Sequence, residues 1–78
     1  MWWLIKKIYE DGAKVIYAYS RENKNLDGEI ECAKDSEEFK CLKLSTGDSE
    51  KSVENFYDHL WRIIFKENCP DEKIIAIG

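Results

Sequence analysis

Apolar residues recur at three- and four-residue spacing only between Ser49 and Asn68. Such spacing places side chains along one side of an α-helix. The residues on this side are Val53, Phe56, Tyr57, Leu60, Ile63 and Ile64. Asp48 or Ser49 can accept the first free backbone N–H groups as N-cap, and the helix should stop before Pro70, because proline disfavours the α region in the preceding residue. We therefore predict one long amphipathic helix over Ser49–Asn68.

The apolar side of this helix is unusually wide, because Trp61 and Phe65 flank the main stripe. At about 100° per residue the apolar side chains spread over about 200°, roughly twice what a helix needs to lie on one face of a sheet. Loops and termini that wrap around a bulky helix explain this width. The alternative is that Trp61 and Phe65 belong to a surface that contacts another chain.

The other apolar runs are short and rich in aromatic and β-branched residues, as in strands. Trp2–Tyr9 and Ala13–Ser20 flank an Asp-Gly pair, which favours a two-residue type I′ hairpin turn at Asp11 and Gly12. This turn predicts the cross-strand pairs Ile8 with Val15, Lys6 with Tyr17, and Leu4 with Tyr19.

Both faces of this predicted hairpin are apolar. One face carries Trp2, Leu4, Ile8, Val15, Tyr17 and Tyr19, and the other carries Trp3, Ile5, Tyr9, Ile16 and Ala18. An antiparallel hairpin with one solvated face should instead alternate apolar and polar side chains. Either the hairpin is covered on both sides, or one side is an interface.

Glu29–Lys34 and Phe39–Leu44 predict a second hairpin. A two-residue loop at Ser36 and Glu37 places Cys32 opposite Cys41. A three-residue loop gives the pairs Cys32 with Leu42, Ile30 with Leu44, and Glu31 with Lys43. We favour the three-residue loop, because it gathers the aliphatic side chains on one face and burial specifies register. It places the two cysteines on opposite faces.

The final run, Lys73–Ile77, is almost continuously apolar and predicts an inner or well-covered strand beside the first hairpin. The element order is then β-β-β-β-α-β. We predict an α+β fold in which a mainly antiparallel sheet of about five strands carries the long amphipathic helix on one face. A chain of 78 residues forms a single domain, residues 1–78.

Charge and cysteine content narrow the functional classes. The formal net charge of −4 argues against a dedicated binder of DNA or anionic membranes, which needs clustered positive charge. No apolar run is long enough for a membrane span or a signal-peptide core. Three cysteines without a C-x-x-C pair do not form a disulfide scaffold. We therefore expect a cytoplasmic protein with reduced thiols.

Few residues are candidates for chemistry. His59 falls on the polar side of the helix, where an ordinary solvated histidine is expected. Asp35, Glu37 and Glu38 sit in a turn, where acidic residues are common, and Cys69 is interpreted as a small apolar filler. The glycines form no phosphate-binding loop, and one histidine cannot complete a usual zinc set. We predict no catalytic, metal-ligating or cofactor-binding residue, no cofactor, and no enzyme activity.

The first hairpin combines aromatic and basic residues: Trp2, Trp3, Lys6, Lys7, Tyr17, Tyr19, Arg21 and Lys24. Platforms for single-stranded nucleic acids combine stacking rings with such charges. A nucleic-acid-binding module is therefore one alternative, although the acidic chain lacks the positive field that these platforms need. A small enzyme that uses His59 or a cysteine is a weaker alternative.

The leading hypothesis is a non-catalytic protein-interaction module or a homodimer, with no membrane association. Its predicted interaction surface consists of Trp3, Ile5, Ile16, Trp61 and Phe65. In this hypothesis Leu4, Ile8 and Val15 pack against the helix, and Ile5 and Ile16 lie on the uncovered side. The inverse assignment of the two faces stays open, because their patterns differ little. One helix covers one face of a small sheet, so one side of the hairpin should lack cover within the chain.

Overall fold

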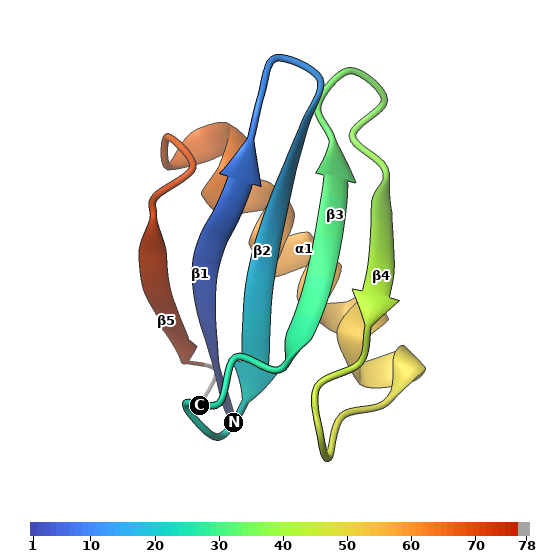
Figure 1. The fold of residues 1–78 in the computed structure, drawn as a ribbon, viewed down its shortest axis with the longest axis vertical. Coiled ribbons are helices and arrows are strands. Elements are labelled where there is room, and N and C mark those ends of the chain that lie inside the picture. Colours follow the sequence, from blue (N-terminus) through green and yellow to red (C-terminus); the bar gives the residue numbers. More distant parts are fainter. Residues whose placement is uncertain (77–78) are drawn as a thin grey trace.

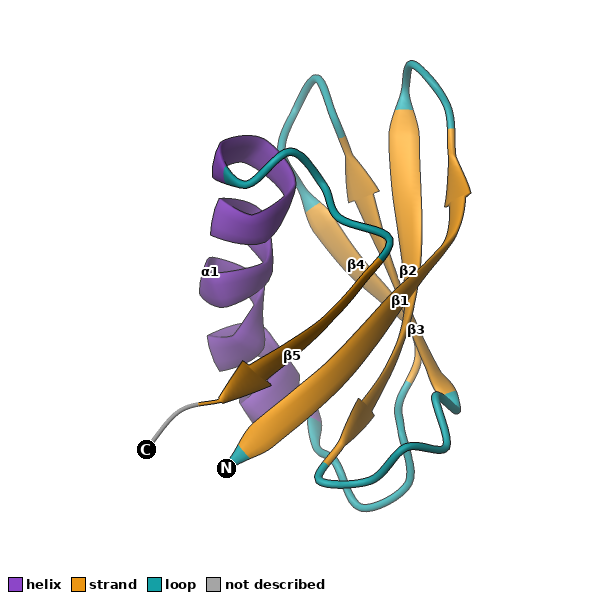
Figure 2. Cartoon of the chain, turned by 90° about the vertical axis from the view of Figure 1, so that its left-hand side faces the viewer, coloured by secondary structure: helices purple, strands orange, loops and turns teal. Residues whose placement is uncertain are grey.

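Residues 1–76, which the computed structural model describes, form a five-stranded sheet with a helix against one of its faces (Figure 1, Figure 2). The elements are, in chain order, β1 (Trp2–Glu10), β2 (Lys14–Arg21), β3 (Gly28–Ala33), β4 (Phe39–Lys43), α1 (Glu50–Lys66) and β5 (Glu72–Ala76). The strands are arranged in the order β4-β3-β2-β1-β5, and every neighbouring pair is antiparallel. The predicted α+β fold and element order are confirmed.

The last strand lies beside the first, as predicted, so β1 is an inner strand between β2 and β5 (Figure 1). The prediction that the last strand is itself inner or well covered is wrong, because β5 forms an edge of the sheet. Its side chains alternate between a buried Ile75 and an Ile74 that is 57% exposed. An apolar run alone does not show how many neighbours a strand has. Ile77, which the prediction included, lies outside the described residues.

Helix α1 begins after Ser49, whose Oγ accepts a hydrogen bond from the backbone N–H of Ser52 at 3.2 Å. This is one of the two predicted N-caps, and it satisfies one of the free donors of the first turn. The helix ends before Asn68, and the backbone N–H of Cys69 donates to the carbonyl of Ile63 at 3.1 Å. No helix among the described residues is long and apolar enough to span a membrane.

The core lies between α1 and the face of the sheet that it covers (Figure 2). The predicted stripe of α1 is buried at Val53, Phe56, Leu60, Ile63 and Ile64. The ring of Phe56 stacks on Trp3 of β1, with centroids 4.8 Å apart, and lies 5.9 Å from the ring of Tyr19 of β2. Aromatic pairs of this kind add about 0.5–1.5 kcal/mol to the energy of burial. Three rings thus join the helix to the centre of the sheet.

The turn of the first hairpin is centred one residue later than predicted. The backbone N–H of Asp11 donates to the carbonyl of Lys14 at 3.0 Å, which makes Gly12 and Ala13 the central residues. The Asp11 carboxylate accepts from the N–H groups of Ala13 and Lys14 at 2.7 and 2.9 Å. Asp11 therefore caps the turn with its side chain, as aspartate often does, and does not occupy the turn centre.

A β-bulge in β1 also shifts the register of the first hairpin. Lys7 pairs with Tyr17 but Tyr9 pairs with Ile16, so Ile8 is an extra residue in β1. The predicted pairs of the first hairpin, such as Ile8 with Val15, are therefore wrong. The shift exchanges the two faces of β1 only: Trp3 and Ile5 lie on the helix-covered side, and Leu4 points away from the helix. In β2, Val15, Tyr17 and Tyr19 face the helix as predicted.

The second hairpin also has a different register from the one predicted. Cys32 pairs with Phe39, Ile30 with Cys41, and Glu31 with Lys40. Neither of the two weighed loops occurs, because the turn is longer and contains Glu37 in a left-handed conformation at φ 58°. Glu37 donates its N–H to the carbonyl of Ala33 at 2.8 Å. Cys32 and Cys41 consequently point to the same, helix-covered face, and the predicted opposite placement is wrong.

Candidate functional site

The side of the sheet that faces away from α1, here called the outer face, carries no helix of the described chain (Figure 2). Its side chains, by strand register, are Trp2, Leu4, Lys6, Ile8 and Tyr9 of β1; Lys14, Ile16, Ala18 and Ser20 of β2; Glu29, Glu31 and Ala33 of β3; Lys40 and Leu42 of β4; and Glu72, Ile74 and Ala76 of β5. The half formed by β5, β1 and β2 is mainly apolar, and the half formed by β3 and β4 is mainly charged.

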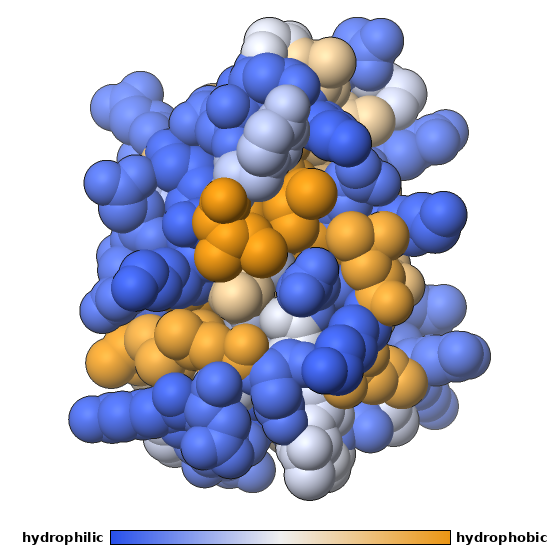
Figure 3. Space-filling model, viewed as in Figure 1, coloured by the Kyte–Doolittle hydropathy of each residue, from blue (hydrophilic) through white to orange (hydrophobic). Residues whose placement is uncertain are grey.

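Several large apolar side chains of the outer face are exposed to solvent. Ile8 is 52% exposed, Tyr9 46%, Leu42 43% and Ile74 57%. Figure 3, which looks onto this face, shows apolar patches in its middle and at its sides, separated by hydrophilic side chains. Exposed apolar patches of this kind are candidates for an interaction site.

The bulge explains why two of these side chains are neighbours. At a β-bulge two residues of one strand face a single residue of the partner strand. Here Ile8 and Tyr9 together lie opposite Ile16, so two large side chains crowd one end of the outer face. Nothing in the spacing of apolar residues indicated this bulge, and sequence reasoning therefore assigned Ile8 to the helix side and missed Ile74 as a member of the surface. Tyr9 was placed on the same face as Ile16, as observed.

The structure corrects the predicted interaction surface at two positions. Trp3 and Ile5 are 2% and 0% exposed and belong to the core under α1, so they cannot meet a partner. Ile16 lies on the outer face and is partly exposed. The expectation that Leu4, Ile8 and Val15 together face the helix is wrong, because only Val15 does. The inverse assignment holds for the first half of β1, whereas β2 keeps the leading one, with Val15 toward the helix and Ile16 on the outer face.

Trp61 and Phe65 lie on α1, away from the outer face, and are half-buried. Their rings are 5.7 Å apart, and the indole Nε1 of Trp61 donates a short hydrogen bond to the carboxylate of Glu37 in the β3–β4 turn. The ammonium of Lys66 lies 5.6 Å from the Trp61 ring centroid. Contacts with a loop of the same chain thus account for part of the wide apolar side of the helix.

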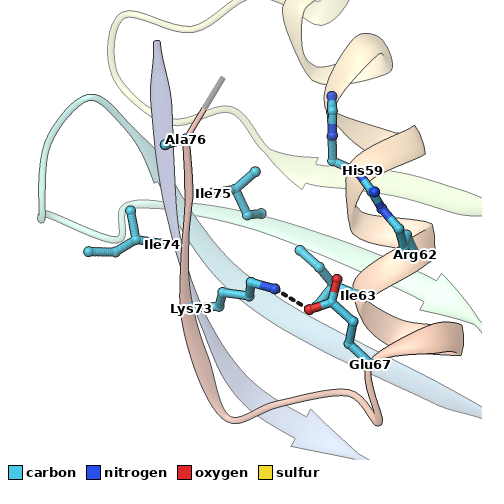
Figure 4. Close-up of a pocket in the computed structure, with 8 residues that line it drawn as sticks. All are labelled: His59, Arg62, Ile63, Glu67, Lys73, Ile74, Ile75 and Ala76. Atoms are coloured by element: carbon cyan, nitrogen blue, oxygen red, sulfur yellow. Dashed lines mark hydrogen bonds and ion pairs between the residues drawn. The ribbon is translucent and has the colours of Figure 1, made fainter. Parts of the chain in front are cut away.

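A cavity of about 570 Å³ lies between α1 and the edge strand β5 (Figure 4). His59 and Arg62 line it from the helix, and Lys73 lines it from β5, where its side chain points toward Glu67 and forms an ion pair with it. His59 has no hydrogen-bond or ion-pair partner among the described residues. A catalytic histidine is normally oriented by a second group and directed at a nucleophile or substrate proton, and this cavity brings no such pair together.

The predicted acidic and metal candidates form no common site. No group of three histidine, cysteine or carboxylate side chains within residues 1–76 is placed to hold a metal ion. Glu37 binds Trp61, and the carboxylate of Asp35 accepts the N–H of Ser36 at 2.8 Å within its own turn. These carboxylates stabilise the β3–β4 turn.

The aromatic and basic residues of the first hairpin do not form a stacking platform. Trp3, Tyr17 and Tyr19 are 2% exposed or less, so their rings are unavailable to bases. The ammonium of Lys7 bonds to the carboxylate of Glu10 at 2.7 Å and to the carbonyl of Cys69 at 3.1 Å. Burial of these three rings removes most of the aromatic surface that suggested nucleic-acid binding, and Trp2 is the remaining ring of the set, half-buried.

Cys32, Cys41 and Cys69 are all free thiols. Burial raises the pKa of the Cys32 thiol to about 11 and also raises the pKa of Cys41. The Cys69 sulfur lies 3.2 Å from the hydroxyl of Tyr17, which donates to the carbonyl of Pro70 at 2.6 Å. Cys69 thus takes part in joining the loop after α1 to the sheet, as well as filling space.

We expect Cys32 to be the least reactive thiol toward iodoacetamide near pH 8. Only the thiolate is nucleophilic, and Cys32 is both buried and shifted to a pKa of about 11. Mass spectrometry after timed alkylation should show Cys69 and Cys41, which are partly exposed, modified first in the native protein and all three modified in denaturant. Early alkylation of native Cys32 would contradict its placement in the core.

Searches against protein-family models, curated proteins and solved structures find no match to this chain. Function must therefore be inferred from the surface and cavities alone.

Proposed function

We propose that the protein is a non-catalytic interaction module that forms a homodimer through the outer face of its sheet. The exposed side chains of Ile8 and Tyr9 at one end of the outer face and of Ile74 on its edge strand, on a sheet side that no helix covers, carry the proposal. Burying these side chains against a second copy stabilises the dimer by roughly 25 cal/mol per Å² of apolar surface removed from water. The loss of freedom on association offsets part of this gain.

The charges of the outer face favour a second copy of the same chain as the partner. Lys6, Lys14 and Lys40 balance Glu29, Glu31 and Glu72, so the face is close to neutral although the chain carries a net charge of −4. The basic side chains come from β1, β2 and β4, and the acidic ones from β3 and β5. In a two-fold dimer the basic side chains of one copy can lie opposite the acidic side chains of the other. A face of this kind can therefore pair with itself without charge repulsion.

The size of the face agrees with a modest interface. The molecule measures 31 × 21 × 20 Å, and the outer face is seen along the shortest axis (Figure 3). A standard interface buries about 800 Å² per partner, which is of the same order as the whole face. We therefore expect a dimer that dissociates on dilution.

The test is sedimentation over a range of concentrations, with the double variant Ile8→Lys/Ile74→Lys. The wild-type chain should shift from monomer to dimer as concentration rises, and the variant should stay monomeric, because each new ammonium would be desolvated in the interface. Both positions are more than half exposed in the monomer, so the variant should keep its near-ultraviolet circular dichroism.

A matched control is Glu54→Gln/Asp58→Asn. It changes the net charge by the same amount on exposed positions of α1, on the opposite side of the sheet, and it should dimerise like the wild type. A wild-type chain that is monomeric at every concentration would remove the homodimer, and a different protein would then be the partner to test.

We also propose that the protein works in a reducing compartment such as the cytoplasm. Cys32 and Cys41 point into the same core but pair with different residues of the second hairpin, and Cys69 lies after the helix. Three unpaired thiols suit a compartment that keeps cysteines reduced.

A further inference from the structure

The backbone of the edge strand β5 uses only half of its hydrogen-bonding groups toward β1. The N–H of Lys7 donates to the carbonyl of Asp71 at 2.7 Å, and these two residues lie directly opposite each other in the register of β1 and β5. Hydrogen-bonded pairs alternate with non-bonded pairs along an antiparallel ladder. The N–H and C=O groups of Lys73 and Ile75 therefore point toward β1 as well.

The backbone groups of the intervening residues, Glu72, Ile74 and Ala76, point away from β1. No strand lies beyond β5 among residues 1–76, and all three residues are exposed, Ile74 to 57%. Free N–H and C=O groups along an edge strand form a template for pairing with a strand of another chain. This side of β5 is here called the free edge.

The cavity between α1 and β5, here called the α1–β5 cleft, reaches the free edge. Ile74 and Ala76 line it although their side chains belong to the outer face, and Figure 4 shows the Ile74 side chain pointing away from α1. The backbone of these residues therefore borders the cleft. A strand added at the free edge would direct every second side chain toward the α1 side of the sheet, where the cleft lies.

The charges of the α1–β5 cleft favour a carboxylate. Lys73 and Glu67 line the cleft as an ion pair, whereas Arg62 also lines it, is exposed, and has no ion pair within the described residues. A guanidinium binds a carboxylate through two parallel hydrogen bonds. The neighbouring His59 can donate a ring N–H in either tautomer. One positive charge thus stays uncompensated in the cleft, and an acidic side chain complements it.

The opposite edge of the sheet is less suited to an acidic strand. There β4 carries Lys40 and Lys43, and lysines on an edge strand discourage pairing. The cavity beside β4 is lined by Glu50 and Glu54, which would repel a carboxylate. In contrast, β5 ends in the uncharged run Ile74–Ala76.

We propose that β5 and the α1–β5 cleft bind an extended acidic segment of a partner protein, which adds to β5 as an antiparallel strand and directs a carboxylate at Arg62. In this mode main-chain hydrogen bonds supply affinity and alternate side chains supply specificity. Antiparallel pairing continues the pattern of every strand pair in the sheet. A β5 strand from a second copy is less suited, because its charged side chain on the helix side, Lys73, is positive like Arg62.

The test titrates the full ¹⁵N-labelled chain with the pentapeptide Val-Glu-Val-Glu-Val, acetylated and amidated at its ends. Its glutamates would lie on the helix side, opposite Lys73 and Ile75. In a ¹H–¹⁵N correlation spectrum the backbone amide peaks of Glu72 and Ile74 should shift with saturation, and their hydrogen exchange should slow. The amides of β4, at the other edge of the sheet, are the internal reference and should not move.

Two N-methylated peptides separate strand pairing from charge attraction. In antiparallel pairing the N–H of the central valine faces Ile74, so methylation of this nitrogen should abolish binding. The N–H of each glutamate points away from β5, so methylation of one glutamate nitrogen is the matched control and should preserve binding.

A charge variant tests the role of Arg62. Arg62→Gln should weaken binding of the pentapeptide several-fold, and Arg62 is exposed, so its replacement leaves the fold intact. Lys51→Gln removes the same charge from an exposed position in the first turn of α1 and should bind like the wild type. A pentapeptide with glutamine in place of both glutamates should also bind several-fold more weakly than the acidic one.

Four results would overturn the proposal. Unchanged Glu72 and Ile74 amides would show that the free edge accepts no strand, and equal binding of the two N-methylated peptides would show attraction by charge alone. Equal affinities of the Arg62→Gln and Lys51→Gln variants would remove the contact with Arg62. Slow exchange of the Glu72 and Ile74 amides in concentrated protein without peptide would assign the free edge to a second copy. A dimer through the outer face buries side chains and leaves these amides without partners, so the test is independent of the proposed homodimer.

Discussion

Replacing Phe56 with alanine is expected to destabilise the protein by about 3–5 kcal/mol. Phe56 is 0% exposed and stacks on Trp3 while touching Tyr19. Its removal therefore leaves a cavity at the point where the helix joins the two central strands. Domains of this size have little stability to lose, so the variant should be largely unfolded at physiological temperature.

Urea denaturation followed by tryptophan fluorescence measures this effect, because Trp3 reports directly on the lost contact. Phe65→Ala is the matched control, since the same side chain is removed from the same helix at a half-buried position. Its loss of stability should be clearly smaller. Equal losses for the two variants would contradict the central position of Phe56.

Replacing Gly28 with alanine should also destabilise the protein, although it adds a single methyl group. A Cβ atom at this position of β3 would overlap Cε1 of Tyr19, and would lie 2.7 Å from Tyr19 Cδ1 and 2.8 Å from the backbone N of Ser45. The Tyr19 ring is fully buried and its hydroxyl accepts the N–H of Ser45 at 3.1 Å. The ring must shift and strain that bond, so we expect a cost of about 1–3 kcal/mol or more.

Gly12→Ala is the natural comparison for this measurement. A Cβ at Gly12, in the first hairpin turn, would meet nothing within 4 Å, and the backbone there is not left-handed. Thermal unfolding should give this variant a free energy of unfolding within about 0.5 kcal/mol of the wild-type value. The value could be slightly higher than that of the wild type, because alanine restricts the unfolded chain. A mild Gly28→Ala variant would show that Tyr19 has room to move.

The helix and the order of elements were predictable because their signals are local and redundant. The buried stripe of α1 matches the predicted one, and the cap at Ser49 follows from ordinary capping chemistry. The start of each strand was also close to the prediction, because apolar runs and turn residues divide the chain clearly. Such features depend on a few neighbouring residues, which the sequence displays directly.

Strand registers were not predictable, because they depend on single irregularities. The extra residue at Ile8 and the turn centred on Gly12 and Ala13 together shift the first hairpin. With both faces apolar, no polar side chain marked one of them as solvated. One residue of slip exchanges the two faces of a strand, and Trp3 and Ile5 therefore moved from the predicted surface to the core.

The candidate interaction surface was likewise predictable in part: its existence follows from the sequence, but its residues do not. A sheet side without cover follows from counting one helix against one sheet, and the structure has such a side. The exposed residues Ile8, Tyr9 and Ile74 could be assigned to this side together only from the observed strand register.

The pairing of the first strand with the last has a consequence for biosynthesis. About 60 residues separate the end of β1 at Glu10 from the start of β5 at Glu72, and a ribosome needs roughly 3–12 s to add them at about 5–20 residues per second. During this interval one edge of the apolar strand β1 has no neighbour to bond with. Unpaired edges of this kind recruit strands from other chains, so nascent copies on one messenger RNA should depend on chaperones until β5 emerges.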